Sequence, residues 1–127
     1  MSLTPTARWR SVAHAARGIA VVLRTQHNAW LHATATALVL AAGIYVELSR
    51  LEWCAIVLAM MAVWTAEALN TAIELVIDLA SPDVHPLAGR AKDVAAGAVL
   101  ISACGAVIVG FLVFSPHVFS ELQHRSP

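Results

Sequence analysis

The sequence predicts an all-α membrane protein, and three observations lead to this fold class. Of the 127 residues, 59% are hydrophobic and 13% are charged, and the mean hydropathy of +0.73 exceeds that of an ordinary soluble domain. Three apolar stretches, at residues 30–48, 53–76 and 94–114, approach the ~20 residues that a helix needs to cross a bilayer. No ten-residue run alternates in the way that membrane strands do, so the backbone must satisfy its hydrogen bonds as helices.

A further helix is predicted at residues 8–25, lying on the membrane surface and not crossing it. Arg10, Arg17 and Arg24 recur every seven residues on one helical face, while apolar residues cluster opposite. This pattern is typical of an interfacial helix. Anchoring is its simplest role, and direct phosphate binding is the alternative. The chain start lacks the apolar core and cleavage site of a signal peptide, so the spans are expected to stay in the mature protein.

The three spans are joined by loops of different character. The first is only "ELSRLE", whereas the second is "LASPDVHPLAGRAKD", in which Pro82, Pro86 and Gly89 are expected to interrupt helix continuation. Because the second loop is longer and more polar, it is the better candidate for chemistry. The third span carries small residues at four-residue intervals that allow close helix packing. These are Ala98, Ser102, Ala106 and Gly110.

Charge placement predicts the orientation of the chain in the membrane. The eight basic and eight acidic residues cancel, so nucleic acid is not an expected partner. Arg50 and Arg125 fall on one side of the predicted spans, and six basic residues fall on the other. Those six are Arg8, Arg10, Arg17, Arg24, Arg90 and Lys92. The positive-inside rule therefore places the N-terminus and the second loop in the cytoplasm.

The second span ends in a polar face that is unusual for a membrane helix. At 100° per residue, Glu67, Asn70, Glu74 and Asp78 fall within about an 80° arc, with Thr71 beside them. Carboxylate and amide oxygens on one face can bind a divalent cation and position a hydroxyl nucleophile for phosphoryl transfer. The structural alternative is hydrogen bonding between helices. Ionisable residues within spans are costly and generally mark functional sites, which favours the first interpretation.

The depth of these carboxylates separates their predicted roles. Counted from Trp53 at the outer surface at ~1.5 Å per residue, Glu67 lies about 21 Å deep and Glu74 about 31 Å, near the inner boundary. Glu67 can therefore meet a lipid headgroup and Glu74 a soluble nucleotide. Two other functions remain open at this point: a non-enzymatic oligomer with a polar seam, and a lipid-modifying enzyme that uses another phosphate donor.

The second loop supplies groups that complement this face. Lys92 can offset phosphate charge, and Asp93 beside it can orient the lysine or help to bind metal. His85 can contact a nucleotide or simply lie on the surface of the loop. The chain lacks a P-loop and a kinase-type glycine loop. Three polar residues at the entrance to the first span either face the same site or mark a solvated helix end: Gln26, Asn28 and His32.

The segments "EALNTAIELVID", "HPLAGRAKDVAAGAVL" and "LSRLEW" resemble the bacterial integral-membrane diacylglycerol kinase and undecaprenol kinase family. The similarity covers about residues 8–114, and its pattern is E-x-x-N-[ST]-A-I-E followed by A-K-D. The resemblance implies an ATP-dependent, magnesium-requiring lipid kinase of the bacterial inner membrane. It also implies three membrane helices behind a surface helix, assembled as a homotrimer with shared active sites. The combination of segments is closer to the undecaprenol kinase branch.

The resemblance also assigns roles to residues of this chain. Glu67 matches the general base for the lipid hydroxyl, and Asn70 matches a polar residue of the active site. Glu74 matches a carboxylate that holds the ATP-bound metal. Lys92 and Asp93 match residues that engage the ATP phosphates and their surroundings.

The remaining matches lie at the nucleotide end and at the first span. Asp78 and His85 fall at nucleotide-side positions. Gln26 stands where family members commonly have a second metal-binding glutamate, and its amide oxygen is expected to bind magnesium more weakly than a carboxylate. His32 stands where some relatives have an acid, and Trp30 where arginine is frequent.

Overall fold

The computed structural model describes residues 5–81 and 83–124, which form four helices and no strand. The helices are α1 (Pro5–Thr25), α2 (His27–Tyr45), α3 (Arg50–Ala80) and α4 (Pro86–His124). The all-α prediction is confirmed, and helices cover the predicted segments 8–25, 53–76 and 94–114 in full. The first predicted span, 30–48, is too long at its end, because α2 stops at Tyr45. Pro82 and Arg125, on which two expectations rested, lie outside the described residues.

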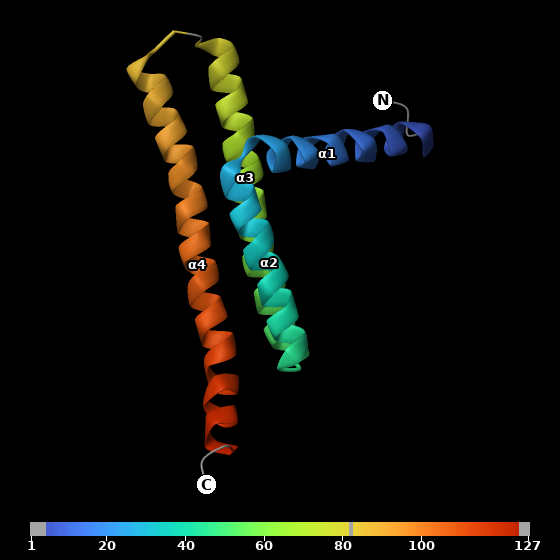
Figure 1. Cartoon of the computed structure of the whole chain (residues 1–127). Coiled ribbons are helices and arrows are strands. Elements are labelled where there is room, and N and C mark those ends of the chain that lie inside the picture. The colour runs from blue at the N-terminus through green and yellow to red at the C-terminus, as the bar shows by residue number, and fades with distance from the viewer. Residues whose placement is uncertain (1–4, 82, 125–127) are drawn as a thin grey trace.

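Three helices form a bundle, and α1, which is called the crossbar below, lies across it. In Figure 1, α2, α3 and α4 run along a common direction, whereas α1 lies crosswise and joins α2 beside the middle of α3. The last turns of α3 and the first turns of α4 extend beyond the level of α1. At ~1.5 Å per residue, the 31 residues of α3 span about 46 Å, which exceeds the ~30 Å of a hydrocarbon core. We therefore expect part of α3 to extend beyond the hydrocarbon core if the helix crosses a bilayer near its normal.

Two helices have the length and composition of a membrane span, namely Arg50–Ala80 and the Pro86–Phe119 part of α4. Helix α2 has 19 residues but falls short in hydropathy, because its first two turns contain His27, Asn28 and His32. Large apolar side chains such as Ile101 (75% exposed) cover the outside of the bundle. A water-soluble domain would bury such side chains. The two longer spans agree with the sequence prediction, and a crossing by α2 remains a prediction.

Helix α3 is longer than predicted at both ends. It begins at Arg50, where Ser49 and Glu52 form a capping box: the Ser49 hydroxyl accepts from the Glu52 N–H, and the Glu52 carboxylate accepts from the Ser49 N–H. It ends at Ala80 and not at residue 76. The whole polar face, including Asp78, therefore lies on one continuous helix.

The predicted second loop is largely helical, which corrects the sequence reading. Pro86 is the first residue of α4, a position where the missing N–H is not needed, and Gly89 continues the helix. The prediction of a loop is therefore wrong for residues 86–93, and Lys92 and Asp93 lie in the first turns of α4. The helix also continues past residue 114, with Pro116 inside it, to His124.

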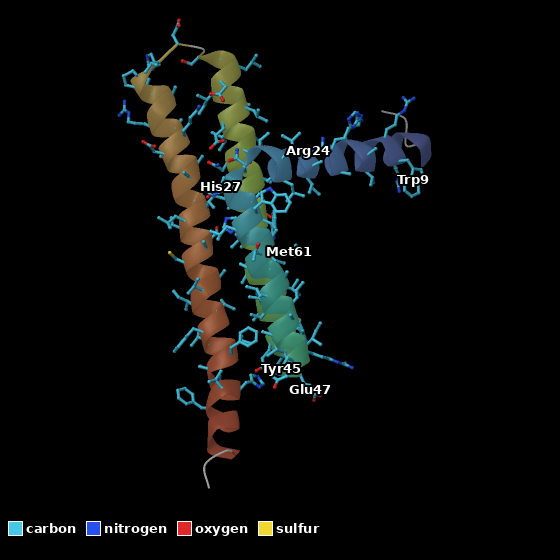
Figure 2. The ribbon with its side chains drawn as sticks, viewed as in Figure 1. Trp9, Arg24, His27, Tyr45, Glu47 and Met61 are labelled. Carbon is cyan, nitrogen blue, oxygen red and sulfur yellow. The ribbon has the colours of Figure 1, made fainter. Side chains whose placement is uncertain are left out.

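The closest packing joins α3 to α4, with a small core of Leu48, Ile56 and Val113 near the end opposite α1. At that end, His117 of α4 is hydrogen-bonded to Glu52, with 2.9 Å between Nε2 and Oε1. Figure 2 labels Tyr45 and Glu47 at this end of the bundle, and Trp9, Arg24 and His27 on or beside α1. The core thus lies far from the polar face. Both cysteines, Cys54 and Cys104, are exposed on the chain.

We predict that Gly43→Ala destabilises the fold at the opposite end from α1. A Cβ at Gly43 would lie 2.8 Å from Trp53 Cη2 and 2.9 Å from Leu48 Cδ1, so the indole must move. Overpacking of this kind costs about 1–3 kcal/mol. Gly105→Ala is the matched control, because nothing lies within 4 Å of its added methyl group. Thermal unfolding in detergent should show a lower Tm for Gly43→Ala alone; equal Tm values in the two variants would contradict this packing.

Candidate functional site

The polar face of α3 changes from buried to exposed along the helix. Glu67, Asn70 and Thr71 are buried, and Glu67 is only 1% exposed. Glu74 is half-buried and Asp78 is exposed. Thr71 is satisfied within the helix, because its hydroxyl donates to the Glu67 carbonyl over 2.9 Å. The face therefore offers one enclosed carboxylate, one partly accessible carboxylate and one solvated carboxylate in sequence.

Glu74 is the centre of a hydrogen-bonded cluster. Its Oε1 accepts from Asn70 Nδ2 over 2.9 Å, and its Oε2 accepts from Gln26 Nε2 over 2.7 Å. Gln26 lies between α1 and α2, so this second bond ties the corner of the crossbar to α3, 48 residues along the chain. The structure thus brings Gln26 to the site, as one of the two open interpretations expects.

The position of Glu74 relates the polar face to the level of α1. Because Gln26 follows α1 directly, its bond to Glu74 sets that carboxylate at the level of the crossbar, beside the corner that Arg24 and His27 mark in Figure 2. Glu67 lies seven residues earlier, about 10 Å nearer the middle of the bundle, and Asp78 lies about 6 Å beyond Glu74. The face thus runs from inside the bundle to its projecting end.

At that projecting end, α3 and α4 are linked by an ion pair. Lys92 Nζ lies 2.5 Å from Asp78 Oδ1, and both side chains are substantially exposed. Among the described residues the lysine therefore pairs with Asp78, although Asp93 is adjacent in sequence and also exposed. His85 is exposed at the start of α4, where its Nδ1 accepts from the Leu87 N–H over 3.2 Å. This bond satisfies one of the free N–H groups of the first turn.

The buried end of the face contains a carboxylate without a hydrogen bond. Among the described residues, no group donates to either oxygen of Glu67. The nearest ionisable group is His32 of α2, whose Nε2 lies 3.8 Å from Glu67 Oε2 and also lacks a hydrogen-bond partner in the described part of the chain. An unpaired buried polar group is costly, so this gap is a place where a polar ligand atom would be stabilised.

The donor atoms around Glu74 suit a hard divalent cation. Magnesium takes oxygen ligands and is usually held by one or two protein carboxylates, with phosphates and water completing its shell. Glu74 supplies such a carboxylate. Gln26 can supply its amide oxygen after a rotation of the amide that exchanges the positions of its oxygen and nitrogen. Within residues 5–81 and 83–124, no three His, Cys, Asp or Glu side chains gather as a cation site. The chain therefore fits a metal that arrives with phosphate oxygens.

Sequence patterns pointed to most of these residues but not to their contacts. Asn28, the third open candidate at the entrance to the first span, is exposed. The pairs His32–Glu67 and Lys92–Asp78 join different helices, and a helical period within one segment carries no signal for them. Trp64, which packs against the His32 ring, and Thr36, which accepts from Trp64 Nε1, had no such signal either.

Comparison with known proteins relates the chain to bacterial lipid kinases. The family model for prokaryotic diacylglycerol kinase matches residues 13–114. An undecaprenol kinase of Bacillus subtilis is 46% identical over 108 residues, 85% of this chain and 88% of that protein. A diacylglycerol kinase of Synechocystis is 37% identical over 111 residues, 87% of this chain and 63% of that protein. A diacylglycerol kinase of Escherichia coli is 34% identical over 100 residues, 79% of this chain and 70% of that protein.

Proposed function

Because the chain belongs to the prokaryotic diacylglycerol kinase family, we propose that its polar face is the active site of a lipid kinase that transfers the γ-phosphate of ATP to the hydroxyl of a membrane alcohol. The observation that carries this proposal is the change in burial from Glu67 to Glu74 along one helix. A reaction between an insoluble alcohol and a soluble nucleotide needs one group inside the bilayer and another at its edge. The two glutamates meet that need.

At the buried end, Glu67 acts as the general base. Its unpaired oxygens can accept the proton of the lipid hydroxyl while the hydroxyl oxygen attacks the γ-phosphorus. The new O–P bond forms as the bond from the γ-phosphorus to the bridging oxygen of ATP breaks, and ADP leaves. Asn70, one turn further along α3, links this end to Glu74 through its amide. Transfer is direct, without a phosphorylated enzyme.

At the exposed end, the chain holds the nucleotide. Glu74 and Gln26 are the residues that would hold magnesium, which would offset the charge of the phosphate oxygens when bound. Lys92 offers its ammonium to the phosphates, with Asp78 orienting it across the α3–α4 gap. Asp93 and His85 lie on the same end of α4 and are proposed to complete the nucleotide surroundings.

Undecaprenol is the proposed lipid substrate, with diacylglycerol as the alternative. Support comes from the 46% identity to the undecaprenol kinase of Bacillus subtilis, against 34% to the diacylglycerol kinase of Escherichia coli. Both alcohols present one hydroxyl near the membrane surface, so the same base serves either. The distinction between them must lie in how the hydrocarbon part is held.

The protein lies in a membrane, as its family and its exposed apolar helices indicate. We propose a single domain in the bacterial inner membrane, crossed by α2, α3 and α4 with α1 on the cytoplasmic surface. Assembly of three copies with shared active sites is also proposed, because the resemblance to the family implies it. Mass measurement of the protein in lipid discs is the test of that stoichiometry.

The proposed function is tested by supplying purified protein in lipid discs with γ-labelled ATP and either alcohol. We expect label in the lipid fraction, with undecaprenol the faster acceptor, and dependence on magnesium. Replacing ATP by GTP or pyrophosphate identifies the donor. A folded protein that labels neither lipid from any donor would overturn the proposal.

Gln26→Glu tests the proposed metal position. Without metal, a glutamate here would set two carboxylates where Gln26 Nε2 and Glu74 Oε2 now lie 2.7 Å apart, and their repulsion should lower the Tm. With magnesium, the added charge should tighten binding roughly tenfold, or about 1.4 kcal/mol. Thermal unfolding with and without magnesium measures both effects. A variant whose Tm responds to magnesium no more than the wild type would exclude Gln26 as a ligand.

A further inference from the structure

The unpaired Nε2 of His32 carries an inference that rests on the proposed function and deepens it. His32 comes from α2 and faces Glu67 of α3 across 3.8 Å, too far for a hydrogen bond between them. A hydroxyl oxygen that lies to one side of the line joining these two atoms can be within ~2.8–2.9 Å of both at once. This is possible because half of their separation is shorter than a normal hydrogen bond. The hydroxyl would accept from the His32 N–H and donate to the Glu67 carboxylate.

The His32 ring packs against Trp64, which is itself held by a hydrogen bond. Trp64 packs edge-on against it, with 6.3 Å between ring centroids and 68° between planes. Trp64 is held in turn by a 3.1 Å hydrogen bond from its Nε1 to Thr36 Oγ1. His32 is thus oriented by a side chain that is itself held in place. A group held in this way loses little conformational freedom when it binds a ligand.

An apolar cavity begins at the same histidine. Its volume is about 350 Å³, at the lower end of the range for small-molecule sites, and α2, α3 and α4 all line it. His32, Thr36 and Trp64 form its polar edge, while Val39, Met60 and Phe111 belong to its apolar wall. A chain of hydrocarbon fits this wall better than a nucleotide does.

We infer that His32 is an acceptor-binding residue: its Nε2–H and the Glu67 carboxylate hold the lipid hydroxyl between them, with the first segment of the hydrocarbon in the adjoining cavity. The N–H donates to the hydroxyl oxygen, and Glu67 takes the hydroxyl proton during transfer. The histidine thereby fixes the oxygen in line for attack. This chemistry is the same for a polyprenyl alcohol and for a diacylglycerol, because each presents one hydroxyl on an apolar chain.

The test compares His32→Phe with His32→Gln. Phenylalanine keeps a ring against Trp64 but removes the donor, whereas glutamine restores an N–H close to the position of Nε2. We expect His32→Phe to raise the KM for the lipid roughly tenfold, the loss of about one hydrogen bond, with the KM for ATP unchanged. His32→Gln should recover most of that loss. His14→Phe, an exposed histidine on α1, is the matched control and should behave as wild type.

Three arms make the outcome decisive. Undecaprenol and diacylglycerol are compared as substrates, and binding of geranylgeraniol, a single-chain alcohol, is measured without ATP. Weaker geranylgeraniol binding in His32→Phe, with recovery in His32→Gln, supports the inference. This holds even if the wild-type protein transfers no phosphate, because that result would overturn only the proposed function. Wild-type lipid kinetics in His32→Phe, or equal losses in both variants, would overturn the role of His32.

Discussion

Glu67→Gln should reduce turnover by about 10²- to 10⁴-fold, the usual contribution of a positioned general base. The substitution keeps the size of the side chain and removes only its ability to take a proton. Because Glu67 lies about 10 Å from Glu74 along α3, the affinity for ATP should change little. Single-turnover transfer to lipid, measured beside an ATP titration, separates these effects.

The matched control for this loss is Glu47→Gln, which removes a carboxylate from the opposite end of the bundle (Figure 2). Glu47 lies in the short turn between α2 and α3 and is exposed. Its replacement should leave both turnover and ATP affinity at wild-type values. If the rate of phosphate transfer in Glu67→Gln were within tenfold of the wild-type rate, Glu67 would not be the general base.

Glu74→Gln should weaken ATP binding and turnover together. The variant loses the charge that the proposed metal requires, and it disturbs the bonds from Gln26 and Asn70 that order the site. We expect magnesium-dependent ATP affinity to fall by about 10- to 100-fold, the range for altered metal sites. Raising the magnesium concentration should restore part of the loss, because the remaining oxygen ligands still bind the cation.

Titrations of ATP at low and high magnesium measure this effect directly. A matched comparison is Asp78→Asn, which removes a carboxylate four residues further along the same face but leaves the Glu74 cluster intact. Its defect should not be relieved by magnesium, since Asp78 contacts Lys92. If high magnesium restored ATP affinity in Glu74→Gln and Asp78→Asn to the same extent, the assignment of the metal to Glu74 would be contradicted.

The fold class and the polar face were predictable because both follow from patterns within single segments. Long apolar runs predict helices, and a period of 3.6 aligns Glu67 with Glu74 whatever surrounds them. Helix ends were predicted less well. Pro86 and Gly89 suggested a loop, yet Pro86 begins α4, and the ends of α3 and α4 are linked by the ion pair between Asp78 and Lys92.

Contacts between helices were beyond the reach of sequence patterns. Which face of α2 meets α3 depends on packing at several positions at once, so His32 and Asn28 were equivalent candidates until the structure separated them. The hydropathy of α2 falls below that of a typical membrane span for a related reason. The polar residues that bring its first turns to the site also lower its hydropathy.

The central claim is that Glu67 acts on the lipid hydroxyl and Glu74 on the ATP-bound metal. It is tested most directly by ATP-binding isotherms of the wild type, Glu67→Gln and Glu74→Gln, measured in the same lipid discs at one fixed magnesium concentration. The account predicts superimposable isotherms for the wild type and Glu67→Gln, with that for Glu74→Gln shifted to weaker binding by at least tenfold. Loss of ATP binding in Glu67→Gln, together with wild-type binding in Glu74→Gln, would contradict it.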